Sequence, residues 1–217
     1  MTVDEALAEL AALEDPKARA VNERHGDPHG VNLTKLRALA KSIGTDQGLA
    51  RELWASGDVA GQLLALLIGK PKPYSADELD TMLRSTRSDK AHDWLLNYMV
   101  AKSPHADALR TRWFDDADPQ VRAAGWALTT RAVTKTDLDR DALLDQIESQ
   151  MKDAAPKLQW AMNETLATIG IEDTSRRARA IGIGEDLQVL ADYPVSKGCT
   201  SPFAPAWIAE MVRRREA

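Results

Sequence analysis

The sequence predicts an all-α solenoid, in which pairs of antiparallel helices stack one after another along the chain. Two stretches of the same design support this prediction. Residues 115–132 have Asp118 as a helix N-cap and Pro119 at the first helical position, where its missing N–H costs nothing. Residues 153–170 repeat the design about 37 residues later, with Pro156 in the place of Pro119, and this spacing is typical of HEAT and armadillo repeats. Such repeats leave a long concave surface that usually binds a partner.

Six helices are predicted in the first half of the chain, at residues 3–14, 18–25, 31–44, 45–57, 58–69 and 75–83. The first has an apolar stripe at helical spacing, and Gly44 and Gly57 end the third and fourth. The fifth is apolar over most of its circumference, so we expect a central helix that packs on several sides. Ser75 and Glu78 form a capping box for the sixth.

Seven further helices are predicted, at residues 91–103, 105–114, 118–133, 137–151, 158–169, 174–183 and 206–215. Residues 190–207 interrupt this pattern, because they contain three prolines and a glycine. Their aromatic side chains argue against disorder, so we expect an irregular clasp that folds back over the last helices. Lys197 and Gly198 could form an anion-binding turn within it or serve the clasp alone. The whole chain, 1–217, is expected to form a single HEAT-like-repeat domain.

Composition and charge limit the classes of function. The 217 residues are 44% hydrophobic and 28% charged, as in an ordinary globular protein. With a formal net charge of −5, a surface for nucleic acid would have to be a local basic patch on an acidic body. A single cysteine, Cys199, excludes an internal disulfide and suits a reducing compartment. The N-terminus is acidic and no apolar run approaches the about 18 residues of a membrane span, so we expect a cytoplasmic protein without membrane contact.

Cationic side chains gather on one predicted helix, whereas no metal site is expected. Lys35, Arg37 and Lys41 give the helix at 31–44 a positive side, which is either a phosphate-binding surface or an ordinary solvated face. His25 and His29 lie in a loop rich in Gly, Pro and Asp, and no cluster of Cys or carboxylates completes a metal site there.

Five stretches of the chain, taken together and in this order, resemble the bacterial DNA alkylation-repair family of HEAT-like-repeat proteins, the AlkD-type glycosylases. These stretches are NLTKLRALAKSIG, ARELWASGDVAGQLLALLIG, HDWLLNYM, DPQVRAAGWAL and LQWAMNETLATIG. The resemblance is greatest to a branch of the family with a Met-Asn pair, here Met162 and Asn163, and a GCTSP segment, here residues 198–202.

The resemblance implies chemistry on double-stranded DNA, including DNA with alkylated bases. Active members of the family cleave the N-glycosidic bond of cationic N3- or N7-alkylated purines and hold the duplex by its backbone on the concave face. Because such a purine is already a good leaving group, the enzyme needs a carboxylate near the sugar and tryptophan faces near the cationic base. Basic side chains bind the phosphates, and no cofactor is implied.

The catalytic motif of the family reads Trp-Asp-x-x-Asp, and the matching residues 93–97 read Asp-Trp-Leu-Leu-Asn. Asn97 therefore occupies the position of the catalytic Asp. An amide can hydrogen-bond a water, but it cannot supply the negative charge that stabilises an oxocarbenium ion.

Three other positions follow from the resemblance. Arg122 matches the family's phosphate-contacting arginine. A later tryptophan of the family falls near Asn163 and Glu164 here, and Trp160, one helical turn earlier, could take its place. Asn97 and Asn163 both lie within predicted helices, where Asn is a poor helix former, which suggests a polar site.

A shifted active site is one hypothesis. It would use Asp93 as the carboxylate and Glu164 as a second one, with Trp94 and either Trp126 or Trp160 as aromatic walls. The structural alternatives are that Asp93 only caps its helix and that Trp126 belongs to the core.

Two functions remain open. The first is a monomeric DNA-binding protein that acts as a DNA glycosylase or a close derivative. Its residues would be phosphate-binding Lys35, Arg37, Lys41 and Arg122, sugar-facing Asp93, Asn97 and Glu164, and base-contacting Trp94 and Trp160. The second is a catalytically inactive HEAT-like-repeat module that binds DNA structures or a protein partner.

Overall fold

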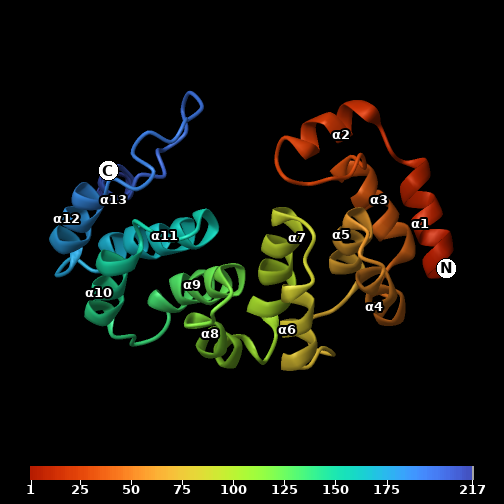
Figure 1. Ribbon diagram of the computed structural model, residues 1–217, viewed down its shortest axis with the longest axis horizontal. Helices are drawn as coiled ribbons and strands as arrows, with labels where there is room; N and C mark the ends of the chain where they lie inside the picture. Colours follow the sequence, from red (N-terminus) through yellow and green to blue (C-terminus); the bar gives the residue numbers. More distant parts are fainter. Residues whose placement is uncertain (217) are drawn as a thin grey trace. The chain divides into compact units, whose positions relative to one another are not determined.

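The computed structural model describes residues 1–216, which are mostly helical (Figure 1). The chain divides into two compact units, Met1–Leu109 and Arg110–Ala217. Within the described range, β-type pairing is limited to an isolated bridge between Glu14 and Val31. The prediction of an all-α protein is therefore confirmed, whereas the single domain over 1–217 stays a prediction.

The first unit is built around a central helix. Its elements are α1 (Val3–Ala12), α2 (Pro16–Glu23), α3 (Leu33–Ile43), α4 (Gln47–Ala55), α5 (Val59–Ile68), α6 (Ala76–Arg84), α7 (Asp89–Trp94), the π-helical turn η1 (Leu95–Met99) and the 3-10 turn η2 (Val100–Lys102). Helix α5 packs against α3, α4 and α7, and nine of its ten residues are buried, as predicted. Asp58 caps α5 by accepting from the Gly61 N–H at 2.7 Å, and Ser75 and Glu78 form the predicted capping box of α6.

The second unit has its core between the two helices that share the repeated design. Helix α8 (Ala106–Phe114) crosses into this unit, and the remaining elements are α9 (Pro119–Val133), α10 (Arg140–Gln150), α11 (Pro156–Glu172), α12 (Arg177–Leu187) and α13 (Ala204–Glu216). Helix α9 packs along α11, and α12 and α13 pack on α11 as well. Asp118 caps α9 as predicted, accepting from the Gln120 N–H at 2.8 Å. A Cβ at Gly125 would lie 2.6 Å from the carbonyl carbon of Trp113, so a side chain there would overlap the backbone of α8.

The prediction of one α-helix over 91–103 is wrong in its detail. The chain passes from α7 through the π-helical turn η1 into the 3-10 turn η2. In η1 the Val100 N–H donates to the carbonyl oxygen of Leu95, five residues earlier. Such π turns occur frequently at functional sites. An apolar pattern predicts helical backbone but does not distinguish a π turn from an α turn, since both keep nearly the same side buried.

Residues 188–203, between α12 and α13, contain no helix and are called the C-terminal segment below. The segment is irregular, as expected, and α13 begins already at Ala204, two residues before the predicted start. Its role as a clasp stays a prediction. Gln188 and Leu190 adopt left-handed backbone conformations, with φ of 54° and 61°. At these residues, just after α12, the chain changes direction and leaves the helix axis.

A buried carboxylate ties α10 to the end of α11. The Asp173 side chain is 8% exposed and accepts hydrogen bonds from Ser175 Oγ at 2.6 Å, Arg140 Nη1 at 2.8 Å and Arg176 Nη1 at 3.0 Å. The bond from Ser175, together with those from the two arginines, holds the pKa of Asp173 well below its usual range. The carboxylate therefore stays charged and paired at any ordinary pH.

Candidate functional site

Two aromatic rings and two cations form a continuous row on the first unit. The Trp94 and Tyr98 rings lie with their centroids 5.2 Å apart at an angle of 42°. The guanidinium of Arg37, from α3, lies 5.5 Å from the Trp94 ring centroid, and Lys102 Nζ lies 5.5 Å from the Tyr98 centroid. These four side chains are called the cation–aromatic row below.

The row depends on the spacing of its members along the chain. Trp94, Tyr98 and Lys102 follow one another at intervals of four residues through α7, η1 and η2, and each contacts the next. Arg37 and Lys102 are exposed, and the two rings are half-buried. A cation held over an exposed ring gains about 0.5–1 kcal/mol, so the rings orient the charges while leaving them open to an anionic ligand. Sequence reasoning identified Arg37 and Trp94 but missed Tyr98 and Lys102, for which the four-residue interval was the available signal.

Asp93 and Asn97 lie beside this row, on α7 and η1. The Asp93 side chain is 58% exposed, and its Oδ1 is 3.2 Å from Nδ1 of the buried His92. Asp93 does not cap α7, because the Ser88 side chain does so by accepting from the Ala91 N–H. The alternative of a purely capping role is therefore wrong. Asn97 is half-buried in the middle of the π turn.

The cations predicted on α3 are all at the surface. Lys35, Arg37 and Lys41 are exposed, and the contact with Trp94 places Arg37 in the cation–aromatic row. The positive side of this helix thus adjoins the row through Arg37.

Two candidate residues on α9 are held by their neighbours. The Arg122 side chain is 25% exposed, and its Nη2 donates to Gln150 Oε1 on α10 and lies 3.8 Å from an Asp115 carboxylate oxygen. Trp126 is fully buried, with its ring stacked on Phe114 at a centroid distance of 4.7 Å. Trp126 is therefore removed from the DNA-contacting set, because a ring inside the core cannot form the wall of an open site.

Asn163 was predicted to be part of a polar site, but in the structure its side chain is buried and binds the protein backbone. Its side chain is 2% exposed, and its Nδ2 donates to the carbonyl oxygen of Pro202 at 2.8 Å. The Met-Asn pair and the GCTSP segment, which the sequence presented as separate motifs, thus meet in space. Asn163 fixes the C-terminal segment to α11, and its neighbour Glu164 is half-buried on the same helix.

Trp160 remains at the surface and lines a pocket of about 490 Å³ at the C-terminal segment. This C-terminal pocket is lined by Trp160, Tyr193, Pro194, Val195, Ser196, Cys199, Thr200, Ser201, Pro202 and Trp207. The Trp160 and Tyr193 rings meet edge to face with centroids 5.3 Å apart. Sequence reasoning missed the pairing with Tyr193, which depends on the path of the segment.

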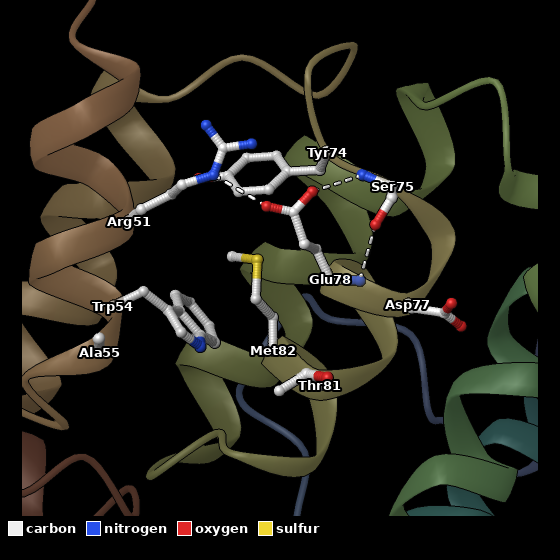
Figure 2. Close-up of a pocket in the computed structure, with 9 residues that line it drawn as sticks. All are labelled: Arg51, Trp54, Ala55, Tyr74, Ser75, Asp77, Glu78, Thr81 and Met82. Carbon is white, nitrogen blue, oxygen red and sulfur yellow. Dashed lines mark hydrogen bonds and ion pairs between the residues drawn. The ribbon is translucent and has the colours of Figure 1, made fainter.

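A second pocket, of about 410 Å³, lies between α4 and α6 (Figure 2). Arg51 lies over the Tyr74 ring at 4.9 Å and donates from Nε to Glu78 Oε1 at 2.9 Å. Arg51 thereby lowers the pKa of Glu78. Trp54 and Met82 form the floor in this view. Because the cation is already neutralised by Glu78, this pocket does not extend the anion-binding surface.

Neither a metal centre nor a membrane span occurs in residues 1–216. No three His, Cys, Asp or Glu side chains in this range are grouped so that they could hold a metal ion. His29 is buried, its Nδ1 accepts from the Val31 N–H at 3.2 Å, and burial lowers its pKa. No described helix combines the length and the apolar character needed to cross a bilayer.

Comparison with known proteins identifies relatives over nearly the whole chain. A family model described as DNA alkylation repair enzyme matches residues 6–194. A relative from Listeria innocua, the uncharacterized protein Lin0241, is 24% identical over 225 residues, which cover 99% of this chain and 98% of the relative.

A solved structure shares the fold. It is from a new family of proteins related to the HEAT-like repeat DNA glycosylases with affinity for branched DNA structures. The match has a TM-score of 0.77 at 21% identity and covers 99% of this chain and 95% of the other. The predicted HEAT-like-repeat fold is therefore confirmed.

Proposed function

The chain belongs to the family of DNA alkylation repair enzymes, and from this membership we propose that it binds branched DNA through the cation–aromatic row. The observation that carries the proposal is the row itself, in which Arg37 and Lys102 stand at the two ends of the Trp94–Tyr98 ring pair. Cations bind the phosphate backbone of any DNA. Aromatic faces add stacking on bases that are not paired within a duplex.

Branched DNA fits this combination better than a continuous duplex does. In a continuous duplex the bases are stacked on each other, so half-buried rings such as Trp94 and Tyr98 find few base faces to contact. At a branch the strands separate and base faces become accessible. The likeness to a protein from a family with affinity for branched DNA supports this choice over a protein partner. The protein would act as a monomer in the cytoplasm.

A second function, the excision of cationic N3- or N7-alkylated purines, is favoured by one observation. The Asp93 carboxylate is 58% exposed and adjoins Trp94 in the chain, so it is accessible to a sugar. A largely exposed carboxylate stabilises a developing cation weakly, because the high dielectric of nearby water screens its charge. Asn97, at the family's catalytic position, has no charge to offer. Structure-specific binding is therefore the preferred function, and excision is the second.

Two assays on the full chain distinguish these functions. Fluorescence anisotropy at low salt would compare a three-way DNA junction with a continuous duplex of equal length, and we expect tighter binding of the junction. Release of N7-methylguanine from a duplex would be measured for the parent and for Asp93→Asn, Glu164→Gln and Asn97→Asp. We expect no release by the parent.

Each outcome of these two assays supports or refutes a particular function. Release by the parent that is lost in Asp93→Asn or Glu164→Gln would establish the second function and identify its carboxylate. Activity gained in Asn97→Asp would mean that the chain kept a glycosylase scaffold without its catalyst. Absence of binding to junction and duplex alike would refute both functions.

A further inference from the structure

The C-terminal pocket has features of a ligand site that the binding row does not use. Trp160 and Tyr193 keep 38% and 47% of their surface exposed although both are large aromatic residues. Their rings contact each other edge to face, and Trp207 lines the same pocket from α13. The volume of about 490 Å³ is within the range of about 300–1,000 Å³ that small-molecule sites have.

The pocket is held open by contacts on both sides of the C-terminal segment. The buried Asn163 holds the Pro202 carbonyl from α11. The Cys199 N–H donates to the Ser196 carbonyl at 3.0 Å, which closes a turn in the wall. A Cβ at Gly184 would lie 2.6 Å from Pro205 Cδ, so the start of α13 is seated directly on α12. The aromatic surface therefore exists before any ligand arrives.

The rim of the pocket is polar and carries cations. Hydroxyl groups of Ser196, Thr200 and Ser201 line it. Arg214, on α13, is 54% exposed and donates from Nη2 to Thr200 Oγ1 at 3.4 Å, while its Nε is paired with Glu210. Lys197 is exposed between two lining residues.

We propose that the C-terminal pocket takes up an unpaired nucleotide of branched DNA, with the base against Trp160 and Tyr193. This proposal rests on the proposed DNA binding and adds the part of the DNA that the second unit recognises. Aromatic walls contact the face of any base, and hydroxyl groups can hydrogen-bond its edge. Lys197 offers positive charge for the adjoining phosphate. Arg213 and Arg214 share the single carboxylate of Glu210, so this pair also keeps a net positive charge, unlike Arg51 beside Glu78. Asp192, next to Tyr193 in the chain, disfavours a second phosphate close by.

Cys199 allows occupancy of the pocket to be measured directly. It is the only cysteine of the chain, it is exposed, and it lines the pocket. The rate of its modification by a maleimide would be compared for the parent without DNA, with a continuous duplex, and with a three-way junction that carries unpaired thymidines. At saturating DNA we expect the junction to slow the modification severalfold and the duplex to leave it unchanged.

Variants test whether the rings are responsible. Trp160→Leu and Tyr193→Leu should each weaken binding of the junction on the order of ten-fold and leave binding of the duplex unchanged. Tyr193→Phe keeps the ring and should bind the junction like the parent. Tyr193 is half exposed, so its variants are expected to fold even if Trp160→Leu does not, and circular dichroism would verify this.

Failure of this proposal is distinguishable from failure of DNA binding. If the parent binds the junction but Cys199 reacts at an unchanged rate and both leucine variants bind normally, the pocket has another occupant, such as an aromatic side chain of a protein partner. Equal protection of Cys199 by duplex and junction would also overturn the proposal, because an ordinary duplex has no unpaired base. No binding of either DNA would refute the proposed function as well.

Discussion

Removal of both cations from the cation–aromatic row should weaken DNA binding and make it less sensitive to salt. The variant is Arg37→Gln/Lys102→Gln, which keeps both aromatic rings in place. Each protein cation that neutralises a phosphate contributes about 0.9 to the slope of log K against log salt concentration. The parent and the double variant should therefore differ in slope by about 1.8.

This difference in slope corresponds to a measurable change in affinity. Between 50 and 200 mM salt the logarithm of the concentration changes by about 0.6, so the parent should lose roughly 12-fold more affinity than the double variant over this range. The assay is fluorescence anisotropy with a labelled junction at four or more salt concentrations. Loss of the two cation–π contacts costs about 0.5–1 kcal/mol each, so thermal melting should first establish that the variant is folded.

A matched control separates the row from the total charge. Lys70→Gln/Lys72→Gln replaces two exposed lysines outside the row and changes the formal net charge from −5 to −7, as the test variant does. Its slope should stay close to that of the parent. Equal slopes for both double variants would show that only net charge matters and would refute the assignment of phosphate contacts to Arg37 and Lys102.

Four predictions concern the scaffold. Asn163→Leu breaks the hydrogen bond to the C-terminal segment and should lower the free energy of unfolding by about 1–2 kcal/mol. Proteolysis should be faster than in the parent, and only within that segment. Gly125→Ala, whose Cβ would meet backbone atoms at 2.6–2.8 Å, should lower the free energy of unfolding by about 1–3 kcal/mol. Gly182→Ala, whose Cβ would meet no atom within 4 Å beyond its own stretch of helix, should raise the free energy of unfolding by about 0.5–1 kcal/mol in urea titrations. Asp173→Asn removes the charge paired with Arg140 and Arg176 and should lower the free energy of unfolding by about 2–4 kcal/mol at neutral pH.

The effect of Asp173→Asn should also depend on pH. The pKa of Asp173 is lower in the folded protein than in the unfolded chain. Its contribution is therefore complete above the unfolded pKa of about 4 and is lost as the pH falls below that value toward the folded pKa. The stability difference between parent and Asp173→Asn should shrink over that acidic range. A constant difference from pH 7 to pH 3 would contradict this prediction. Slower proteolysis of Asn163→Leu, stabilisation by Gly125→Ala or destabilisation by Gly182→Ala would contradict the other three.

The helices and their ends were largely determined by the sequence itself. Asp118 with Pro119, and Ser75 with Glu78, start helices in the structure as predicted. The burial of α5 also followed from composition, since a helix that is apolar on all sides can only be stable inside a core. These features are local, because a cap or an apolar turn is formed by residues within about four positions of one another.

The functional surfaces, by contrast, were decided by tertiary contacts. Each of the two repeated helices carries one tryptophan, Trp126 seven residues after its proline and Trp160 four residues after its own. Trp126 is fully buried against Phe114, whereas Trp160 stands at the surface beside Tyr193. Helices α9 and α11 carry apolar residues around most of their circumference. Their sequences therefore do not indicate which side each helix turns to its neighbours.

The role of Asn163 was also decided by a tertiary contact and not by the local sequence. A buried amide within a helix suggested a polar site, but its partner is a carbonyl 39 residues further along the chain. Cap and periodicity signals reach only a few residues, whereas the choice between a ligand-binding amide and a structural one depends on which distant backbone group comes within hydrogen-bonding distance. That choice is made when the C-terminal segment packs on α11, and only the tertiary structure records it.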